Sequence, residues 1–395
     1  MKLWEKGYSP DKTIELFTVG KDPFLDLDLL PFDLDGSIAH ALVLEEAKVL
    51  TTIEKDLIIN ELENIRELYK SGDFKIETSD EDCHTAIENH LTKKLGDAGK
   101  KIHTARSRND QVLTAVRLYQ KDRLIKIKLK VSDLYSTFLK FSEEYTDVPM
   151  PGFTHTRKAM PYTVGKWIQA FADSIEDDLG LLESVIEMVD QNPLGTGAGF
   201  DVPFPLDREI STKKLGFKKT MSSALYAQNS RGKIESAVLF ACSNILTSLN
   251  RWASDIILFA MPDFKFFTLD DGLTTGSSIM PHKKNPDVLE LIRSSVHQLV
   301  AYQNQVQNTS LNLISGYNRD IQLTKEPLIN GLKTTSDCLE VANIVMKGLK
   351  VNKDNLENAM SDELFSVQKV YELVQRGVPF REAYKILADL MMKEK

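Results

Sequence analysis

The sequence predicts a mainly α-helical protein whose long helices form a bundle. Residues 112–145 contain neither proline nor glycine, and apolar residues recur there every three to four positions. At about 1.5 Å per residue, this run makes a helix of roughly 50 Å, a length typical of bundles and coiled assemblies. Residues 222–259 form a second long helical run with an almost continuously apolar middle, which predicts burial on most sides. Further helical runs lie at 162–190, 288–308 and 327–349.

Composition indicates a soluble, cytoplasmic protein with two or three domains. The 395 residues are too many for one ordinary core, and the net charge of −8 argues against a nucleic-acid partner. The opening MKLWEKGYSPDK lacks the apolar core of a signal peptide, and no run reaches the roughly 18 apolar residues of a membrane span. Cys83, Cys242 and Cys338 are scattered, which predicts small core residues and neither a disulfide framework nor a zinc site.

The first third of the chain is predicted to begin irregularly and to continue as three helices. Aromatic residues alternate with prolines at the start, which indicates irregular structure anchored by rings. These residues are Trp4, Pro10, Phe17, Pro23, Phe24, Pro31 and Phe32. Helices are expected at 35–50 and 52–69 from their apolar spacing. A third is expected through Leu95, with 79–82 as an N-cap and acidic first turn.

Two polar segments of the middle region are candidate sites. In KIHTARSRNDQ (101–111), Arg106 and Arg108 flank Ser107, and Asn109 follows; arginine can hold a carboxylate by two parallel hydrogen bonds. As bare residues, however, such a run is more often a solvated turn. His155 lies after a break, just outside a predicted helix, where it could transfer a proton, although an isolated histidine is more often structural.

A glycine-rich loop and a mixed polar loop follow. Residues 192–199 are glycine-rich but lack both the GxGxxG spacing and the lysine of a phosphate-binding loop. Residues 276–287, GSSIMPHKKNPD, are predicted to be a loop because Pro281 and Pro286 forbid a continuous helix. Its hydroxyls, ammonium groups and backbone N–H groups could surround a small anion. The alternative is a polar surface loop with a solvated lysine pair.

These segments together resemble a known enzyme family. GSSIMPHKKNPD is similar to the mobile catalytic loop of the fumarase/aspartase superfamily, whose members split a fumarate unit from a substrate. The string TARSRNDQ closely resembles the TxRSRNDQ segment of argininosuccinate lyases, which sets that branch apart. GYNRDIQLTK (316–325) resembles the YNxDxQxxK segment of the same family, and 192–199 resembles its LGxGA loop.

Two segments match the family with departures. GFTHTRKAMP resembles GYTHxQRAQP and keeps the Thr-His pair and the proline. Its departures are Phe153, Arg157, Lys158 and Met160. Arg231 matches a substrate-binding arginine of the family, although Tyr226 and Gly232 stand where aspartate is common.

The resemblance implies a three-domain superfamily fold with a tetrameric helical core. The expected domains are a mixed, helical one at 1–105, a long-helix bundle at 106–350 and a short helical one at 351–395. The implied assembly is a homotetramer in which three subunits contribute to each active site. The resemblance implies neither a cofactor nor a metal, and it places the protein away from membranes.

The implied reaction is the reversible cleavage of argininosuccinate to arginine and fumarate. A base removes a proton beside a carboxylate, and the resulting carboxylate-enolate must be stabilised by groups already in place. By resemblance Ser277 is the base, and Lys283 favours its alkoxide. His155 is the candidate acid for the leaving nitrogen, oriented by Glu290.

The other candidates are assigned to substrate binding. Those for the succinyl carboxylates are Ser107, Arg108, Asn109, Thr154 and Asn285. Those for the arginine portion are Arg231, Tyr317, Gln322 and Lys325, with Asp82 as a further candidate.

Two alternatives stay open. His282 replaces a glutamine that is more usual in argininosuccinate lyases, which keeps adenylosuccinate lyase as a second candidate. The segments 106–111 and 317–325 argue against it. An inactive structural relative is the other alternative, since the family also supplies a lens protein, but all the candidate catalytic groups are present.

Overall fold

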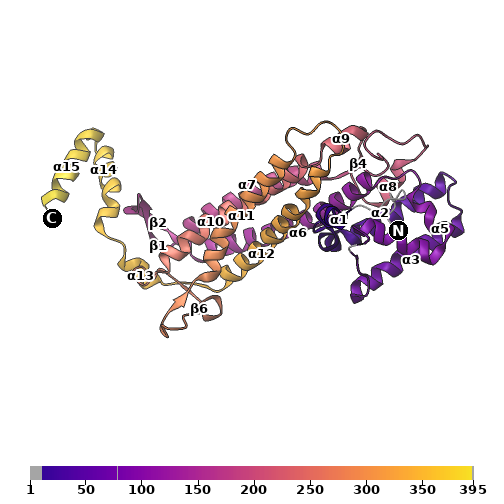
Figure 1. The fold of residues 1–395 in the computed structure, drawn as a ribbon. Helices are drawn as coiled ribbons and strands as arrows, with labels where there is room; N and C mark the ends of the chain where they lie inside the picture. The colour runs from indigo at the N-terminus through magenta and orange to yellow at the C-terminus, as the bar shows by residue number, and fades with distance from the viewer. Residues whose placement is uncertain (1–10, 78, 394–395) are drawn as a thin grey trace. The chain divides into compact units, whose positions relative to one another are not determined.

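The computed structural model describes residues 11–77 and 79–393, and the predicted mainly helical fold is confirmed (Figure 1). Contacts divide the chain into two compact units. Unit 1 comprises Met1–Lys128, Gly180–Ser243 and His297–Ser336, and unit 2 comprises Leu129–Leu179, Asn244–Val296 and Asp337–Lys395. The domain boundaries at 105 and 350 stay predictions. Trp4 and Pro10 lie outside the described residues.

Unit 1 begins with two helices where irregular structure was predicted, so that prediction was wrong. The helices are α1 (Lys12–Val19), capped by Asp11, and α2 (Asp22–Glu46). Pro23 lies in the first turn of α2, where a missing N–H costs little. Pro31 lies inside α2, where it costs about 3 kcal/mol. Burial of Leu29, Leu30 and Leu34 offsets this cost, since each fully buried leucine contributes about 1.5–3 kcal/mol.

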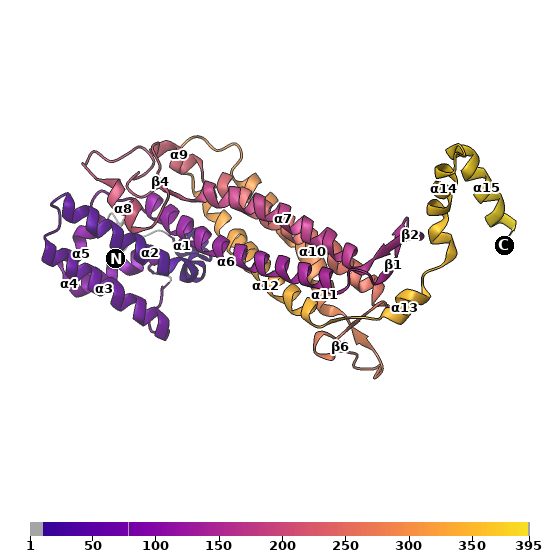
Figure 2. The same ribbon diagram turned by 180° about the vertical axis from the view of Figure 1, so that it is seen from behind.

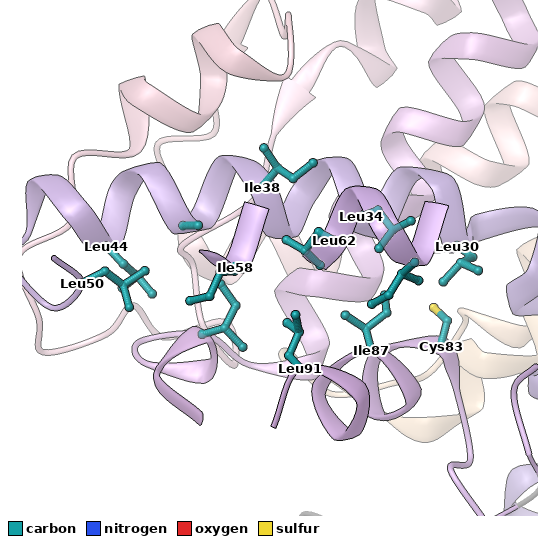
Figure 3. Close-up of a cluster of buried hydrophobic side chains, with 13 residues drawn as sticks. Leu30, Leu34, Ile38, Leu44, Leu50, Ile58, Leu62, Cys83, Ile87 and Leu91 are labelled. Atoms are coloured by element: carbon teal, nitrogen blue, oxygen red, sulfur yellow. The ribbon is translucent and has the colours of Figure 1, made fainter. Parts of the chain in front are cut away.

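The core of unit 1 lies between α2 and the two helices that follow it. These are α3 (Thr52–Ser71) and α4 (Cys83–Leu95), which pack on α2 and on each other. Thr51 and Glu54 form a capping box that fixes the start of α3. Figure 3 shows the apolar side chains of the three helices pointing toward one another. The short helices α5 (Asp97–Lys100) and η1 (Lys101–His103) then lead into the arginine-rich segment.

The remainder of unit 1 includes an interruption that the sequence did not predict. The run 222–259 was expected to be one helix but forms α9 (Ala224–Asn229) and α10 (Lys233–Phe259). Gly232 has a positive φ of 79°, which breaks the helix between them. The smaller elements are β3 (Gln191–Asn192), paired in parallel with β4 (Lys219–Thr220), α8 (Arg208–Lys214) and η3 (Arg319–Thr324).

Five long helices lie in the predicted helical runs, four of them largely as predicted and α10 in the later part of its run, and each contributes residues to both units. They are α6 (Arg108–Glu144), α7 (Val164–Val189), α10, α11 (Asp287–Thr309) and α12 (Lys325–Lys347). In unit 2 their segments lie side by side (Figure 2), with Lys130 of α6 bound to Glu340 of α12 at 2.7 Å. Ser174 of α7 and Ser248 of α10 share a hydrogen bond of 2.8 Å. Phe138 packs beside Trp252 in the same core.

Short strands and the C-terminal helices complete unit 2. The strands form antiparallel pairs: β1 (Pro149–Thr154) with β2 (Arg157–Thr163), β5 (Phe267–Leu269) with β8 (Leu349–Val351), and β6 (Thr275–Gly276) with β7 (Lys284–Asn285). The helices are η2 (Asp271–Leu273), α13 (Lys353–Asn358), η4 (Asp362–Phe365), α14 (Ser366–Gln375) and α15 (Phe380–Lys393). Among the described residues, no helix is long and apolar enough to cross a membrane. The three cysteines are buried and unpaired, as predicted.

Candidate active site

Seven of the predicted binding residues line one pocket of unit 1. The pocket has a volume of about 160 Å³. The predicted residues in its wall are Asp82, Arg108, Asn109, Arg231, Tyr317, Gln322 and Lys325. Asp22, Val112 and Arg319 complete the lining and were not singled out from the sequence. Four cations and two carboxylates therefore surround a small space, which suits a ligand with several charges.

Lys325 is a buried cation in the lining of this pocket. It begins α12, and its Nζ lies 2.5 Å from Asp26 Oδ1 and 3.1 Å from Asp22 Oδ2 on α2. Burial lowers the pKa of Lys325, but the carboxylates of Asp26 and Asp22 outweigh it and raise the pKa overall. Lys325 is therefore charged at neutral pH, and a third N–H of its ammonium group remains for a ligand.

Arg108 lies at another wall, at the start of α6. Its guanidinium donates to Asp82 and, at 3.3 Å, to Glu81. Asp82 is the N-cap of α4 and also accepts hydrogen bonds from the backbone N and the Oγ1 of Thr85, both at 2.9 Å. Burial raises the pKa of Asp82, but His84 and Arg108 outweigh it and hold the pKa below its usual range. Asp82 therefore orients the arginine as a carboxylate.

Arg231 and the segment around η3 also line the pocket. The guanidinium of Arg231 lies over the ring of Tyr317, 5.0 Å from its centroid. Gln322 donates to the carbonyl oxygens of Thr18 and Val19, at 3.0 and 3.2 Å, and accepts from Arg319. These bonds attach η3 to the end of α1, so the amide of Gln322 is already oriented.

The arginine-rich segment is fixed by Asp110, which the sequence did not single out, and by Arg106, which anchors it. Asp110 is fully buried; one oxygen accepts from the backbone of Ser107, and the other accepts from Gly195 and Gly197 at 2.9 and 3.0 Å. Asp110 thus joins the segment to the glycine-rich loop. Arg106 donates to Ser37 of α2 at 2.9 Å and so serves as an anchor. The repeated glycines were the available signal, since a close backbone approach requires small residues.

One buried cluster, which contacts the pocket residue Lys325, has ligand types suited to a metal. Atoms of Asp26, Cys83 and His84 lie within 4.8 Å of one another. Asp26 is already bound to the ammonium of Lys325, and burial raises the pKa of Cys83 well above its usual value, which keeps the thiol neutral. His84 is held by Asp33 at 2.9 Å. These side chains take part in an ion-pair and hydrogen-bond network with Lys325 and Asp33.

His155 lies in the two-residue turn between β1 and β2, in unit 2. The prediction that it lies just outside a helix was wrong, because the flanking residues pair as strands, Thr154 opposite Arg157. His155 and Thr156 both have positive φ, 52° and 58°, as a tight hairpin turn requires. The imidazole and Thr154 are exposed. Two non-glycine residues in this conformation store strain, which is typical of functional turns.

The polar loop between β6 and α11 also belongs to unit 2. The hydroxyl oxygen of Ser277 accepts hydrogen bonds from the backbone N of Ile279 and Met280, at 3.4 and 3.2 Å. Lys284 is bound to Asp271 at 2.5 Å, whereas Lys283 has no ion pair in the described part of the chain. Backbone N–H groups aimed at the serine oxygen favour negative charge on it. The loop therefore suits a serine that loses its proton.

The predicted residues thus fall into two groups. The seven pocket residues and Ser107 belong to unit 1. Thr154, His155, Ser277, Lys283, Asn285 and Glu290 belong to unit 2. Within the described residues, no hydrogen bond or ion pair joins the imidazole of His155 to Glu290 or to the 276–287 loop.

The family model and the most similar curated proteins agree on one family. Residues 20–301 match a family described as Lyase. An argininosuccinate lyase from Thermotoga neapolitana is 47% identical over 394 residues, covering 100% of this chain and 99% of the relative. One from Phocaeicola vulgatus is 43% identical over 384 residues, covering 97% of this chain and 86% of the relative.

Solved structures share the fold. An EDDS lyase in complex with formate superposes with a TM-score of 0.83 at 23% identity, covering 98% of this chain and 77% of that one. A class II fumarase from Schistosoma mansoni has a TM-score of 0.81 at 16% identity, covering 98% of this chain and 89% of that one. At these identities the likeness is one of fold alone.

Proposed function

The chain belongs to the argininosuccinate lyase family, and we propose that it cleaves argininosuccinate reversibly to arginine and fumarate in arginine biosynthesis. The reaction is the elimination of a carbon–nitrogen bond through a carboxylate-enolate. The observation that carries the proposal for this chain is the one pocket lined by seven of the predicted binding residues, six of which match the family by resemblance. Its mixture of cations and carboxylates complements the charges of an amino acid.

Ser277 is the proposed base. Its oxygen takes the proton from the carbon beside a succinyl carboxylate, and the N–H groups of Ile279 and Met280 stabilise the alkoxide. Lys283 adds a positive charge on the same loop. Water must be excluded for a serine to act in this way, and closure of the loop over the substrate would do so.

His155 is the proposed acid, which gives a proton to the leaving guanidino nitrogen. Its exposed position at the tip of the hairpin allows it to reach a ligand. Glu290 is the proposed carboxylate partner that orients the imidazole. The ammonium of Lys158 bonds to the carbonyl of Ala359 at 2.7 Å, which holds the hairpin near its turn.

The remaining residues are proposed to bind the two ends of the substrate. Ser107, Arg108, Asn109, Thr154 and Asn285 bind the succinyl carboxylates. Arg231, Tyr317, Gln322, Lys325 and Asp82 bind the arginine portion. Asp82 and Glu81 already accept hydrogen bonds from the guanidinium of Arg108, so this arginine is oriented before the ligand arrives. A succinyl carboxylate would compete with these two carboxylates for the guanidinium.

We further propose a cytoplasmic homotetramer whose active sites draw on more than one subunit. Large apolar residues are exposed on the long helices, among them Leu129 of α6, Leu291 of α11 and Ile344 of α12. Apolar residues on successive helices of a bundle favour association with further helices. The three buried, unpaired cysteines suit a reducing compartment.

The function is tested by mixing purified protein with argininosuccinate and following fumarate by its ultraviolet absorbance. Adenylosuccinate is run in parallel. Fumarate release from argininosuccinate alone is the expected result. Release from adenylosuccinate alone would transfer the same chemistry to the second candidate, and silence on both from folded protein would favour an inactive relative.

A further inference from the structure

We infer that Asp22 is a specificity-determining residue, which binds the α-ammonium group of the arginine portion while the adjacent Lys325 binds its α-carboxylate. This inference rests on the proposed function and names the contact that selects an α-amino acid. Asp22 lines the pocket at the start of α2, and its side chain is 17% exposed. It belongs to none of the sequence motifs that carry the family resemblance.

The carboxylate of Asp22 has fewer partners than its two acidic neighbours. Asp26 accepts from the ammonium of Lys325 at 2.5 Å and from the backbone N of Cys83 at 3.1 Å. Asp82 accepts from Arg108 and twice from Thr85. In the described part of the chain, Asp22 has one hydrogen-bonded or ionic partner, Lys325 at 3.1 Å. Most of its acceptor sites are therefore available to a ligand.

The electrostatics of the pocket favour a cation beside Asp22. Burial raises the pKa of Asp22, Lys325 opposes this effect, and the nearby carboxylates of Asp26 and Asp82 add to it. A partly buried carboxylate with incomplete pairing is stabilised when a cation is added. The neighbouring carboxylates of Asp26 and Asp82 already have several partners. An ammonium group of a ligand is therefore stabilised most beside Asp22.

The Asp22–Lys325 pair complements the zwitterion of an α-amino acid. An amino acid carries its ammonium and carboxylate on one carbon, and the pair presents the opposite charges 3.1 Å apart. Lys325 uses two of its three N–H groups for Asp26 and Asp22 and can direct the third to the ligand carboxylate. Adenylosuccinate has no such zwitterion at its leaving end, so the same pair would disfavour it.

The inference is tested by comparing L-arginine with its des-amino analogue, 5-guanidinopentanoate, as ligands of the unsubstituted protein and of Asp22→Asn. A charge-assisted hydrogen bond contributes about 1.5–3 kcal/mol, or roughly ten- to hundredfold in affinity. Unsubstituted protein should bind L-arginine tighter than the analogue by that factor, by calorimetric titration. Asp22→Asn should weaken the binding of L-arginine by a similar factor and change the affinity for the analogue by no more than about twofold. The KM for argininosuccinate should rise.

Asp28→Asn is the matched control. Asp28 lies on the same helix and pairs with a lysine of α12, Lys333, at 2.7 Å, but outside the pocket. It should leave both affinities unchanged. Equal weakening of both ligands by Asp22→Asn would overturn the inference, because it would mean that Asp22 only positions Lys325.

If Asp22→Asn does not fold, the affinities of the unsubstituted protein for the two ligands still test the inference. Equal binding of the two ligands by that protein would also overturn the inference. Turnover of argininosuccinate by the same preparation tests the proposed function separately. A failure of the proposed function can therefore be told apart from a failure of the inference about Asp22.

Discussion

Ser277 holds its hydroxyl at the start of a turn whose backbone N–H groups already face it. If this oxygen is the base, Ser277→Ala should lower kcat by about 10²- to 10⁴-fold, the usual contribution of a positioned acid or base. Steady-state fumarate release measures this. The neighbour Ser278 is exposed and supplies the matched control, since Ser278→Ala should keep kcat within about twofold. A near-normal rate for Ser277→Ala would show that another group takes the proton.

His40 makes the stability of unit 1 depend on pH. Its ring is buried, with Nε2 2.9 Å from the carbonyl of Thr104, and burial together with Arg106 lowers its pKa to about 3. The folded protein therefore keeps this histidine neutral, whereas the unfolded chain gains a proton below its ordinary pKa of 6.5. The contribution of His40 to the free energy of unfolding is complete above pH 6.5 and is lost as the pH falls toward 3.

At pH 4.5, about two units below the unfolded pKa, the loss reaches about 2.7 kcal/mol. His40→Gln keeps an N–H donor but does not titrate, so the stability advantage of unsubstituted protein over this variant should shrink by that amount between pH 7.5 and 4.5. Urea unfolding at fixed protein concentration measures both proteins. Buried His84 is present in both and cancels in the difference. An advantage that does not vary with pH would contradict the prediction.

The break between α9 and α10 depends on one glycine. A Cβ added to Gly232 would lie 2.5 Å from Cβ of Ser310, in addition to the strain of a positive φ. Gly232→Ala should therefore cost at least about 2 kcal/mol of unfolding free energy, from strain and overpacking together. It should also raise KM, because Arg231 precedes it in the pocket wall.

Gly216→Ala is the comparison, since that glycine also has a positive φ but no atom within 4 Å of the added Cβ. It should cost only about 1 kcal/mol and leave KM unchanged. Denaturant unfolding of the two variants measures the difference. Equal costs would mean that Ser310 moves aside without penalty.

The sequence predicted the long helices better than their interruptions. Apolar spacing found α3 and α6, and helical runs were also expected where α7, α11 and α12 lie. It missed the start of α2, where buried leucines outweigh Pro31, and the hairpin that carries His155. In both places tertiary packing decides the structure, and local propensity does not.

The candidate site was also predicted only in part from the sequence. Motif resemblance pointed to residues on separate segments, six of which line one pocket together with the further candidate Asp82. Asp22 joined that pocket without a motif signal, and Arg319 occupies a position that the motif leaves open. Their place in the pocket depends on how α1, α2 and η3 meet. The anchoring bonds of Asp110 to Gly195 and Gly197 span more than eighty positions, so no local pattern could reveal them.

For the assembled protein, the division of the candidate residues between two units makes a shared active site testable. Asn109 belongs to unit 1 and lines the pocket, whereas Ser277 belongs to unit 2. Asn109→Ala and Ser277→Ala should each inactivate the protein when present in every subunit. In a tetramer that builds each site from different copies, mixed assemblies contain some sites with neither substitution.

Equal co-expression of the two variants should restore about a quarter of normal activity, since each site draws its pocket and its loop independently and each is unsubstituted half of the time. The matched control pairs Ser277→Ala with Lys283→Met. Both residues lie on one loop, so every site receives a defective loop whichever copy supplies it, and no activity should return. Fumarate release by purified mixed tetramers measures both combinations. If the Asn109 and Ser277 variants also failed to restore activity, each site would take both residues from a single chain, and the shared-site assembly would be wrong.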